Sequence, residues 1–285
     1  KIYGKVFGVV SAKGGAGTTT TAVNLATSIA SMPATKVAVI DLGYPLGDAA
    51  ALMDARPQFS VFDAFKVGSR LDTVLLESYI TNKHGISLLA APMEVEERAL
   101  PDQDTFRETL KVVTETFTHA VVDVPSHLDL EYLHAFSKMC TQLLVVVTPE
   151  LLSLWKTHRL LNYMNRWDIP GKLKLVVNKN DRSEEITTRQ IQKMLDLKIS
   201  WRLPFDYDSA IHAINHGKPL VRENNSSLAT AFGTMAEELT GLTLPQKRKA
   251  GLLSGFMRKK QKASGPKSSL LEAVSDTSSE HSALF

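Results

Sequence analysis

The chain has 285 residues, 44% of them hydrophobic, which is enough for one large core or at most two small ones. Its single cysteine, Cys140, excludes a disulfide framework and any site built from several thiolates, and no aliphatic run approaches the roughly 20 residues that cross a bilayer. The net charge of +3 belongs to the residues after 246, which hold eight Lys or Arg against three Asp or Glu, and the slightly acidic remainder argues against nucleic-acid binding.

Short apolar runs alternate with stretches of helical period along most of the chain. Runs rich in β-branched residues predict buried strands at Val6–Val10, Val37–Ile40, Ile86–Ala90, Ala120–Val124, Leu143–Val147, Leu173–Val177 and Ile199–Leu203. Helices are predicted at Thr19–Ser31, Phe106–Phe117, Leu130–Lys138, Leu151–Met164 and Thr188–Leu195, with two more near Asp208–His216 and Leu228–Leu239. This alternation predicts an α/β fold with a mostly parallel sheet flanked by helices, whose ligands bind at the carboxyl ends of the strands.

The segment "SAKGGAGTTTTAVNLA" at 11–26 follows the first predicted strand and opens the first long helix. Gly14, Gly15 and Gly17 let backbone N–H groups turn inward around phosphate oxygens, and the helix N-terminus adds partial positive charge. The hydroxyl of Thr19 then lies where it can bind Mg²⁺. The structural alternative is an ordinary glycine turn with a threonine N-cap, but the order of lysine, glycines and threonines favours phosphate binding.

The same letters carry a family resemblance. "AKGGAGTTTTAVNLA" resembles the deviant Walker A motif of the MinD/ParA superfamily, with Lys13 at the signature lysine. The resemblance continues through "VIDLGYPLGDAAALMD", "LLAAP", "VVDVPSHLD", "VVVTPELLSL", "LVVNKNDR" and "LPFDYDSAIHAINHGKPL". In this order the segments look most like the TadZ/CpaE branch, whose ATPase-like members position the Flp (Tad) pilus assembly machinery. The resemblance covers about residues 1–243 and implies a three-layer P-loop NTPase-like fold that binds ATP and Mg²⁺.

The resemblance also implies roles for individual residues. The nucleotide would be bound by Lys13, Gly14, Gly15, Ala16, Gly17, Thr18, Thr19, Thr20, Asn178, Pro204, Phe205 and Asp206, the last four facing adenine. The metal would be held by Thr19, Asp41 and Asp123, with Asp41 close to the reacting groups. Lys13 would reach across a homodimer to the phosphates of the partner's nucleotide. Acidic residues at strand ends also cap helices and turns, which is the alternative for Asp41 and Asp123.

Two positions depart from the superfamily pattern. Thr18 stands where the loop normally has a second lysine, so we expect nucleotide binding to be weakened but retained by the glycine cradle. Gly43 stands where many relatives have the second acid of Asp-x-Asp, which orients the attacking water. Because phosphoryl transfer depends on positioning and charge neutralisation, we expect hydrolysis to be impaired more than binding. Asp48 could supply the missing acid, although an N-cap of the helix "AAALM" is the role that its position favours.

A second interpretation of the base site comes from "NKND" at 178–181, which fits the Asn-Lys-x-Asp pattern that selects guanine in many GTPases. The match is four residues long, and Asn followed by a basic residue also occurs in adenine-binding relatives. ATP is therefore the main prediction and GTP the alternative.

After Thr243 the composition changes to Lys, Ser, Gly and Pro, so we expect a nucleotide-binding domain over 1–243 and a flexible basic tail over 244–285. Leu252, Leu253, Phe256 and Met257 lie between two basic clusters, so the segment 250–260 is a candidate amphipathic anchor, with a solvated linker as the alternative. Because residue 1 is Lys, we also expect that an upstream receiver-like domain belongs to the natural protein.

Three function classes follow. The main prediction is an ATP-dependent positioning factor for a Flp/Tad-type pilus or secretion machine, dimerising on ATP with weak or absent hydrolysis. The alternatives are an active ParA/MinD-type ATPase for DNA partition or division-site placement, and a pseudo-ATPase scaffold that binds no nucleotide. The expected partners are a second copy of the chain and proteins of the pilus or secretion machinery. We expect the protein in the cytoplasm, peripherally at the inner face of the membrane where the tail binds it.

Overall fold

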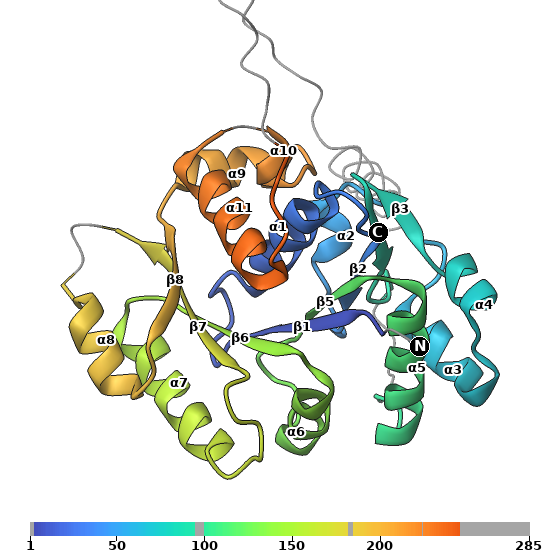
Figure 1. The fold of residues 1–285 in the computed structure, drawn as a ribbon, viewed down its shortest axis with the longest axis horizontal. Coiled ribbons are helices and arrows are strands. Elements are labelled where there is room, and N and C mark those ends of the chain that lie inside the picture. The colour runs from blue at the N-terminus through green and yellow to red at the C-terminus, as the bar shows by residue number, and fades with distance from the viewer. Residues whose placement is uncertain (1–2, 95–99, 182–184, 224, 246–285) are drawn as a thin grey trace, which may run out of the picture.

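A single eight-stranded sheet forms the centre of the computed structural model, which describes residues 3–94, 100–181, 185–223 and 225–245 (Figure 1). Across the sheet the order is β3-β4-β2-β5-β1-β6-β7-β8, and all neighbours are parallel except β3 and β4. The strands are β1 (Lys5–Val10), β2 (Val37–Asp41), β3 (Thr81–Lys83), β4 (Ile86–Leu89), β5 (His119–Asp123), β6 (Gln142–Val147), β7 (Leu173–Asn180) and β8 (Ile199–Pro204).

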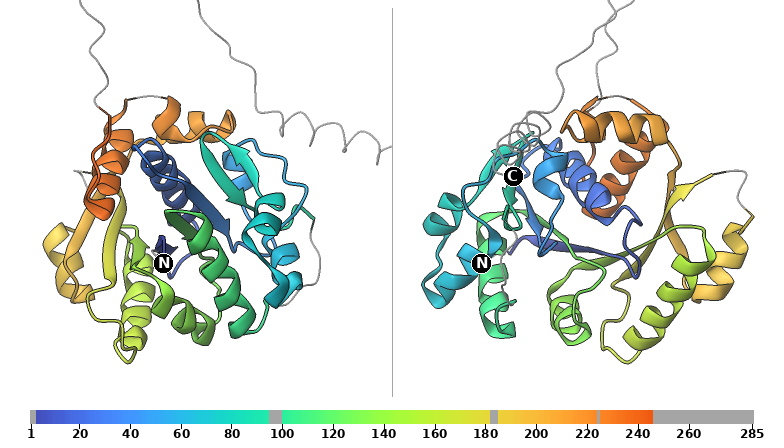
Figure 2. Two further views of the ribbon diagram at one scale, coloured as in Figure 1. Left: turned by 45° about the vertical axis from the view of Figure 1, so that its right-hand side comes forward. Right: turned by 180° about the vertical axis from the view of Figure 1, so that it is seen from behind.

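Helices cover both faces of the sheet, giving three layers (Figure 2). One face packs against α1 (Thr18–Ala30), α2 (Ala49–Leu52), α9 (Tyr207–Asn215), α10 (Leu220–Glu223) and α11 (Ser227–Thr240). The other face packs against α3 (Val61–Val67), α5 (Gln103–Thr116), α6 (Leu130–Met139), α7 (Leu151–Met164) and α8 (Thr188–Leu195). The 3₁₀ turn η1 (Gly68–Arg70) and α4 (Thr73–Ser78) lie beside α5.

The central strand shows how the sequence builds these layers. In β1, Phe7 and Val9 join the core beneath α1, while Val6 and Val10 join the core on the opposite face. Both faces are therefore apolar, as a parallel sheet covered on both sides requires. A side chain at Gly8 would collide with Phe136 and Leu143, so this glycine allows α6 to approach the strand closely.

The predicted α/β architecture is confirmed. Every predicted strand and helix is present, with ends shifted by at most three residues. The exceptions lie between 55 and 83, where α3, η1, α4 and β3 were not predicted, and at the short helix α10. No helix among the described residues is long and apolar enough to span a membrane.

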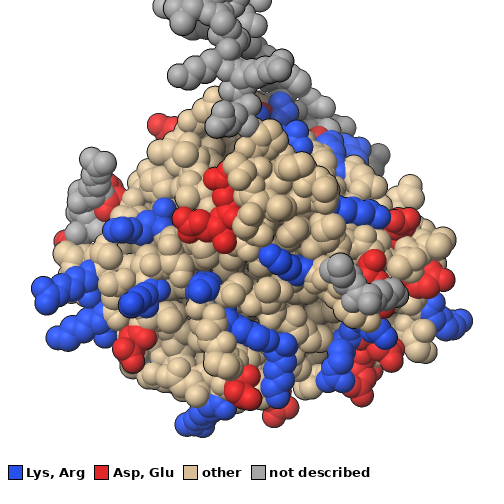
Figure 3. Space-filling model, in the orientation of Figure 1, with Lys and Arg blue, Asp and Glu red and all other residues tan. Residues whose placement is uncertain are grey.

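Lys and Arg side chains alternate with Asp and Glu over the face shown in Figure 3, without a single basic patch. This distribution agrees with the slightly acidic balance of the residues before 247. The basic tail and its proposed anchor at 250–260 lie outside the described residues.

Candidate functional site

The loop between β1 and α1 lies at the carboxyl end of the sheet and borders a cavity of about 830 Å³. Gly15 and Gly17 have left-handed backbone, with φ of 77° and 92°, so both positions favour glycine. A Cβ at Gly17 would lie 2.3 Å from Nδ2 of Asn178, which adds a steric reason for glycine there. The loop and the start of α1 thus present backbone N–H groups at a helix N-terminus, an arrangement suited to a phosphate anion.

Two buried carboxylates lie at the ends of neighbouring strands at this edge of the sheet. Asp41 ends β2 and Asp123 ends β5, in direct register, and their exposures are only 1% and 3%. Asp41 accepts hydrogen bonds from the backbone N–H groups of Gly43 (2.7 Å) and Ala49 (3.1 Å). Burial raises the pKa of Asp41, and burial together with the charge of Asp41 raises the pKa of Asp123, while a hydrogen bond from the Thr19 hydroxyl opposes the shift.

This donor set fits Mg²⁺. Two buried acids that lie beside each other and near the charge of Asp48 are costly to ionise, and a dication would offset that cost. The described residues hold no group of three or more His, Cys, Asp or Glu that could bind a metal alone. Mg²⁺ does not need three protein ligands, because it is commonly held by one or two carboxylates together with substrate phosphates and waters. Thr19, Asp41 and Asp123 would hold the ion, which would neutralise phosphate charge.

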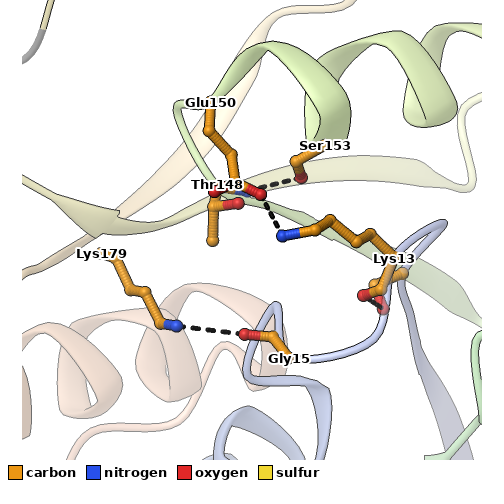
Figure 4. Close-up of polar contacts among 7 residues, drawn as sticks. Lys13, Gly15, Thr148, Glu150, Ser153 and Lys179 are labelled. Carbon is orange, nitrogen blue, oxygen red and sulfur yellow. Dashed lines mark hydrogen bonds and ion pairs between the residues drawn. The ribbon is translucent and has the colours of Figure 1, made fainter.

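Lys13 forms an ion pair outside the cavity lining in this structure. Its ammonium forms an ion pair with Glu150, at the start of α7, and both side chains are partly exposed (Figure 4). The hydrogen bond from Lys13 holds the pKa of Glu150 below its ordinary value. Lys13 is not among the residues that line the cavity. Within one chain Lys13 therefore pairs with Glu150, and its role toward a partner's phosphates stays a prediction.

Thr18 is tied to the end of β1. Its hydroxyl donates to Oγ of Ser11 at 2.9 Å, so its own side chain lies against the loop. On the opposite side, Asn178 at the end of β7 donates from Nδ2 to the carbonyl of Ala16 at 2.8 Å. The same amide accepts from the backbone N–H of Lys179 at 2.8 Å. Asn178, predicted to face the base, thus holds the loop through Nδ2 and the backbone of Lys179 through Oδ1.

The far wall of the cavity is apolar. It is formed by Pro204, Phe205 and the residues of α9 and α11 that face the loop, including Ile211, Ile214 and Phe232. Asp206 caps α9 by accepting from the backbone N–H of Ser209 at 3.1 Å. Flat apolar surface beside a phosphate cradle is what a nucleotide base requires.

The loop from 42 to 48 closes the phosphate side of the cavity. Position 43 in this loop is a glycine and supplies no carboxylate. Asp48 lines the cavity and occupies the N-cap position of α2. The predicted cap is only half right, because Asp48 makes no capping bond and Asp41 accepts from Ala49 instead. His127, from the loop after β5, lies within 2.8 Å of the Tyr44 carbonyl through Nε2 and connects the two loops.

Most of the predicted site residues therefore meet in one place. The cavity is lined by Gly14, Gly15, Gly17, Thr18, Thr19, Thr20, Asp123, Asn178, Pro204, Phe205 and Asp206. Ala16 and Asp41 are buried behind the lining, and Lys13 lies beside it. Two further lining residues, His127 within "VVDVPSHLD" and Lys179 within "NKND", lie in segments that the sequence singled out but had no predicted role.

Comparisons with known proteins agree with this geometry. The profile of a family described as "AAA domain" matches residues 4–176. Among curated proteins, the septum site-determining protein MinD of Synechocystis sp. is 25% identical over 249 residues, covering 85% of this chain and 91% of that protein.

Solved structures share the fold. A ParA family ATPase from Chlorobium tepidum superimposes with a TM-score of 0.78 at 24% identity, covering 84% of this chain and all of that one. The MinD of the Aquifex aeolicus MinC:MinD complex gives 0.71 at 22% identity, covering 86% and 98%. MinD from Pyrococcus horikoshii, solved with Mg-ADP, gives 0.64 at 21% identity, covering 82% and 95%.

Proposed function

Because the chain belongs to the AAA domain family, we propose that it is a member of the MinD/ParA superfamily that binds ATP with Mg²⁺ and determines the position of other cellular components. The observation that carries the proposal is that the glycine loop borders a cavity of about 830 Å³ at the strand ends where Asp41 and Asp123 are buried. A phosphate cradle, two metal-binding carboxylates and an apolar wall for the base would then belong to one site.

Placement at the division site is the biological role that the comparisons favour. The curated relative reported above is a septum site-determining protein, whereas nothing in the comparisons supports the predicted Flp/Tad pilus role. Partition on DNA is less favoured, because the residues before 247 carry a slightly acidic balance of charge, and the face in Figure 3 is of mixed charge. Pilus positioning and the TadZ/CpaE branch therefore stay predictions from the sequence.

Turnover should be slow. Thr18 directs its hydroxyl to Ser11, and Gly43 brings no acid to the phosphate side of the cavity. A single cationic group at the transferring phosphoryl can account for about 10³–10⁵ in rate, so the loss of the loop lysine affects hydrolysis strongly. Binding depends on many backbone contacts and is expected to persist.

A homodimer is part of the proposal. Within one chain Lys13 is held by Glu150, so delivery to a second chain's phosphates requires that ion pair to open. Both partners are partly exposed, and exposed ion pairs contribute only about 0–1 kcal/mol, so the pair is easily exchanged for a phosphate contact. Light scattering with ATP should show mass doubling that Lys13→Ala abolishes and Glu150→Gln leaves intact or promotes.

Fluorescent mant-ATP binding, with phosphate release measured in parallel, tests the function. Saturable binding that requires Mg²⁺ and is lost in Asp123→Ala, with turnover far below the 1–100 per second of ordinary kinases, is the expected result. Asp104→Ala, an exposed acid on α5, is the matched control. No binding by the unaltered chain would favour the nucleotide-free scaffold, and preference for mant-GTP would favour the guanine reading of "NKND".

A further inference from the structure

Lys179 brings a positive charge to the phosphate loop from another part of the chain. It follows Asn178 at the end of β7, and its ammonium donates to the carbonyl of Gly15 at 3.1 Å (Figure 4). Among the described residues that line the cavity, it is the one Lys or Arg. A positive charge thus reaches the loop from a strand more than 160 residues further along the chain.

The backbone places this side chain. Lys179 has a left-handed backbone with φ of 55°, an uncommon conformation for a lysine, and its N–H is held by Oδ1 of Asn178 at 2.8 Å. Asn178 is itself fixed to the loop through the carbonyl of Ala16 at 2.8 Å. Residues in such conformations persist where surrounding contacts determine them, and they concentrate at binding sites.

The two loop positions that would normally bring positive charge to the phosphates do not do so in this structure. Thr18 occupies the position of the loop lysine and is neutral, with its hydroxyl on Ser11. Lys13 is paired with Glu150 outside the cavity lining. Lys179 donates to a backbone carbonyl and has the exposed Glu150 as a more distant electrostatic neighbour, and an anionic phosphate is a stronger acceptor for an ammonium than a neutral carbonyl.

We propose that Lys179 supplies the phosphate-binding charge that the missing loop lysine would supply, without restoring that lysine's part in hydrolysis. When a nucleotide binds, the ammonium of Lys179 leaves the Gly15 carbonyl and bonds to a phosphate oxygen. A lysine on β7 then provides the positive charge that position 18 lacks. This inference rests on the proposed function, because it names a further binding residue of the same site. Lys179 is a phosphate-binding residue here, not a base-reading one.

The test measures binding of Mg²⁺ complexes of mant-ATP and mant-ADP, and competition by inorganic tripolyphosphate and by adenosine. Lys179→Met should weaken binding of the nucleotides and of tripolyphosphate by about ten- to a hundred-fold, the worth of one charge-assisted contact, and should leave adenosine unchanged. Lys193→Met removes an exposed lysine on α8 and should have no effect. Lys179→Arg should retain most of the affinity.

The decisive variant is Thr18→Lys in the Lys179→Met background. Returning the charge to the loop should restore affinity there, and should add less in the unaltered chain, because one charge does the work of the other. Unchanged melting temperatures would show that each variant folds. Nucleotide binding by Lys179→Met equal to that of the unaltered chain, or an equal loss for adenosine, would overturn the inference alone. Failure of the unaltered chain to bind any probe would overturn the proposed function and this inference together.

Discussion

Asp41 and Asp123 make the stability of this protein depend on pH. Burial raises both pKa values, so the folded chain keeps protons that the unfolded chain releases above a pH of about 4. The free energy of unfolding should therefore fall as pH rises through neutrality in the absence of Mg²⁺. Melting temperatures measured from pH 5 to 8.5 should show this slope, and Mg²⁺ with nucleotide should reduce it.

Asp123→Asn checks the cause of that slope. Because the amide carries no charge, this variant should melt higher than the unaltered chain, by much more at pH 8.5 than at pH 5, and should lose the stabilisation by Mg²⁺ and nucleotide. Asp104→Asn, at an exposed position on α5, is the control. A variant with the same pH slope as the unaltered chain would contradict this account of the two carboxylates.

Gly17 gives a second prediction at the residue scale. Gly17→Ala should destabilise the fold and abolish nucleotide binding, because its φ of 92° strains any side chain and the new Cβ would displace Asn178. Gly171→Ala is the matched control: its φ is 69°, but a Cβ there meets nothing within 4 Å. We expect about 1–2 kcal/mol from strain alone at Gly171, with mant-ATP binding unchanged, and more than that at Gly17. Equal losses of stability in the two variants would mean that the Asn178 side chain moves aside at no cost, and would contradict this prediction.

Some site residues could be predicted because they lie together in one short segment of the sequence. Others come together only through the fold. Gly15, Gly17 and Thr19 belong to one continuous segment, so their spacing alone predicted a phosphate loop. Lys179 reaches that loop only because β7 lies two strands from β1 in the sheet, with β6 between them. Strand order is not encoded in any short segment, so this contact needed the structure.

At the scale of elements, the strongly periodic segments were predicted well and the short ones were not. The α7 helix shows helical periodicity over 14 residues, and α1 is a 13-residue segment that directly follows the glycine loop, so their positions were clear. In contrast, α3, α4 and β3 have three to seven residues each. Such short segments are stabilised by packing against neighbours, as Phe62 and Phe65 do in the core, and not by their own sequence preference.

The N-cap of α9 links an element to the site. Asp206→Ala removes the bond to the N–H of Ser209 and should cost about 0.5–2 kcal/mol of stability. Because α9 carries the apolar wall, binding of mant-ATP should weaken as well. Asp72→Ala removes the equivalent cap of α4, which accepts from Leu75 at 2.8 Å far from the cavity lining. It should lose stability but bind normally, and an equal binding defect in both variants would contradict a specific role for α9.

At the scale of the whole molecule, the described domain ends against α11. Gly241 turns the chain back with a φ of 74°, and the N–H of Leu244 donates to Glu237 at 2.7 Å. Leu244 also packs into the core on the α1 face. A chain that stops after Pro245 keeps these contacts, so it should melt at the temperature of the full chain and bind mant-ATP equally.

The basic tail beyond that point supplies the last prediction. Each Lys or Arg near an anionic membrane contributes about 1 kcal/mol, so the clusters at Lys247–Lys249 and Arg258–Lys260 add attraction that the few apolar residues between them lack. One tail binds weakly, whereas an ATP-driven dimer presents two and gains avidity. In co-sedimentation with anionic liposomes at low salt, the full chain should pellet with ATP, and the chain ending at Pro245 should not. Phe256→Glu should reduce pelleting more than Ser264→Glu, which adds the same charge without removing an apolar group. Equal pelleting by all four proteins would reduce the tail to a linker, and pelleting of the full chain that ignores ATP would remove the dimer switch while leaving the anchor.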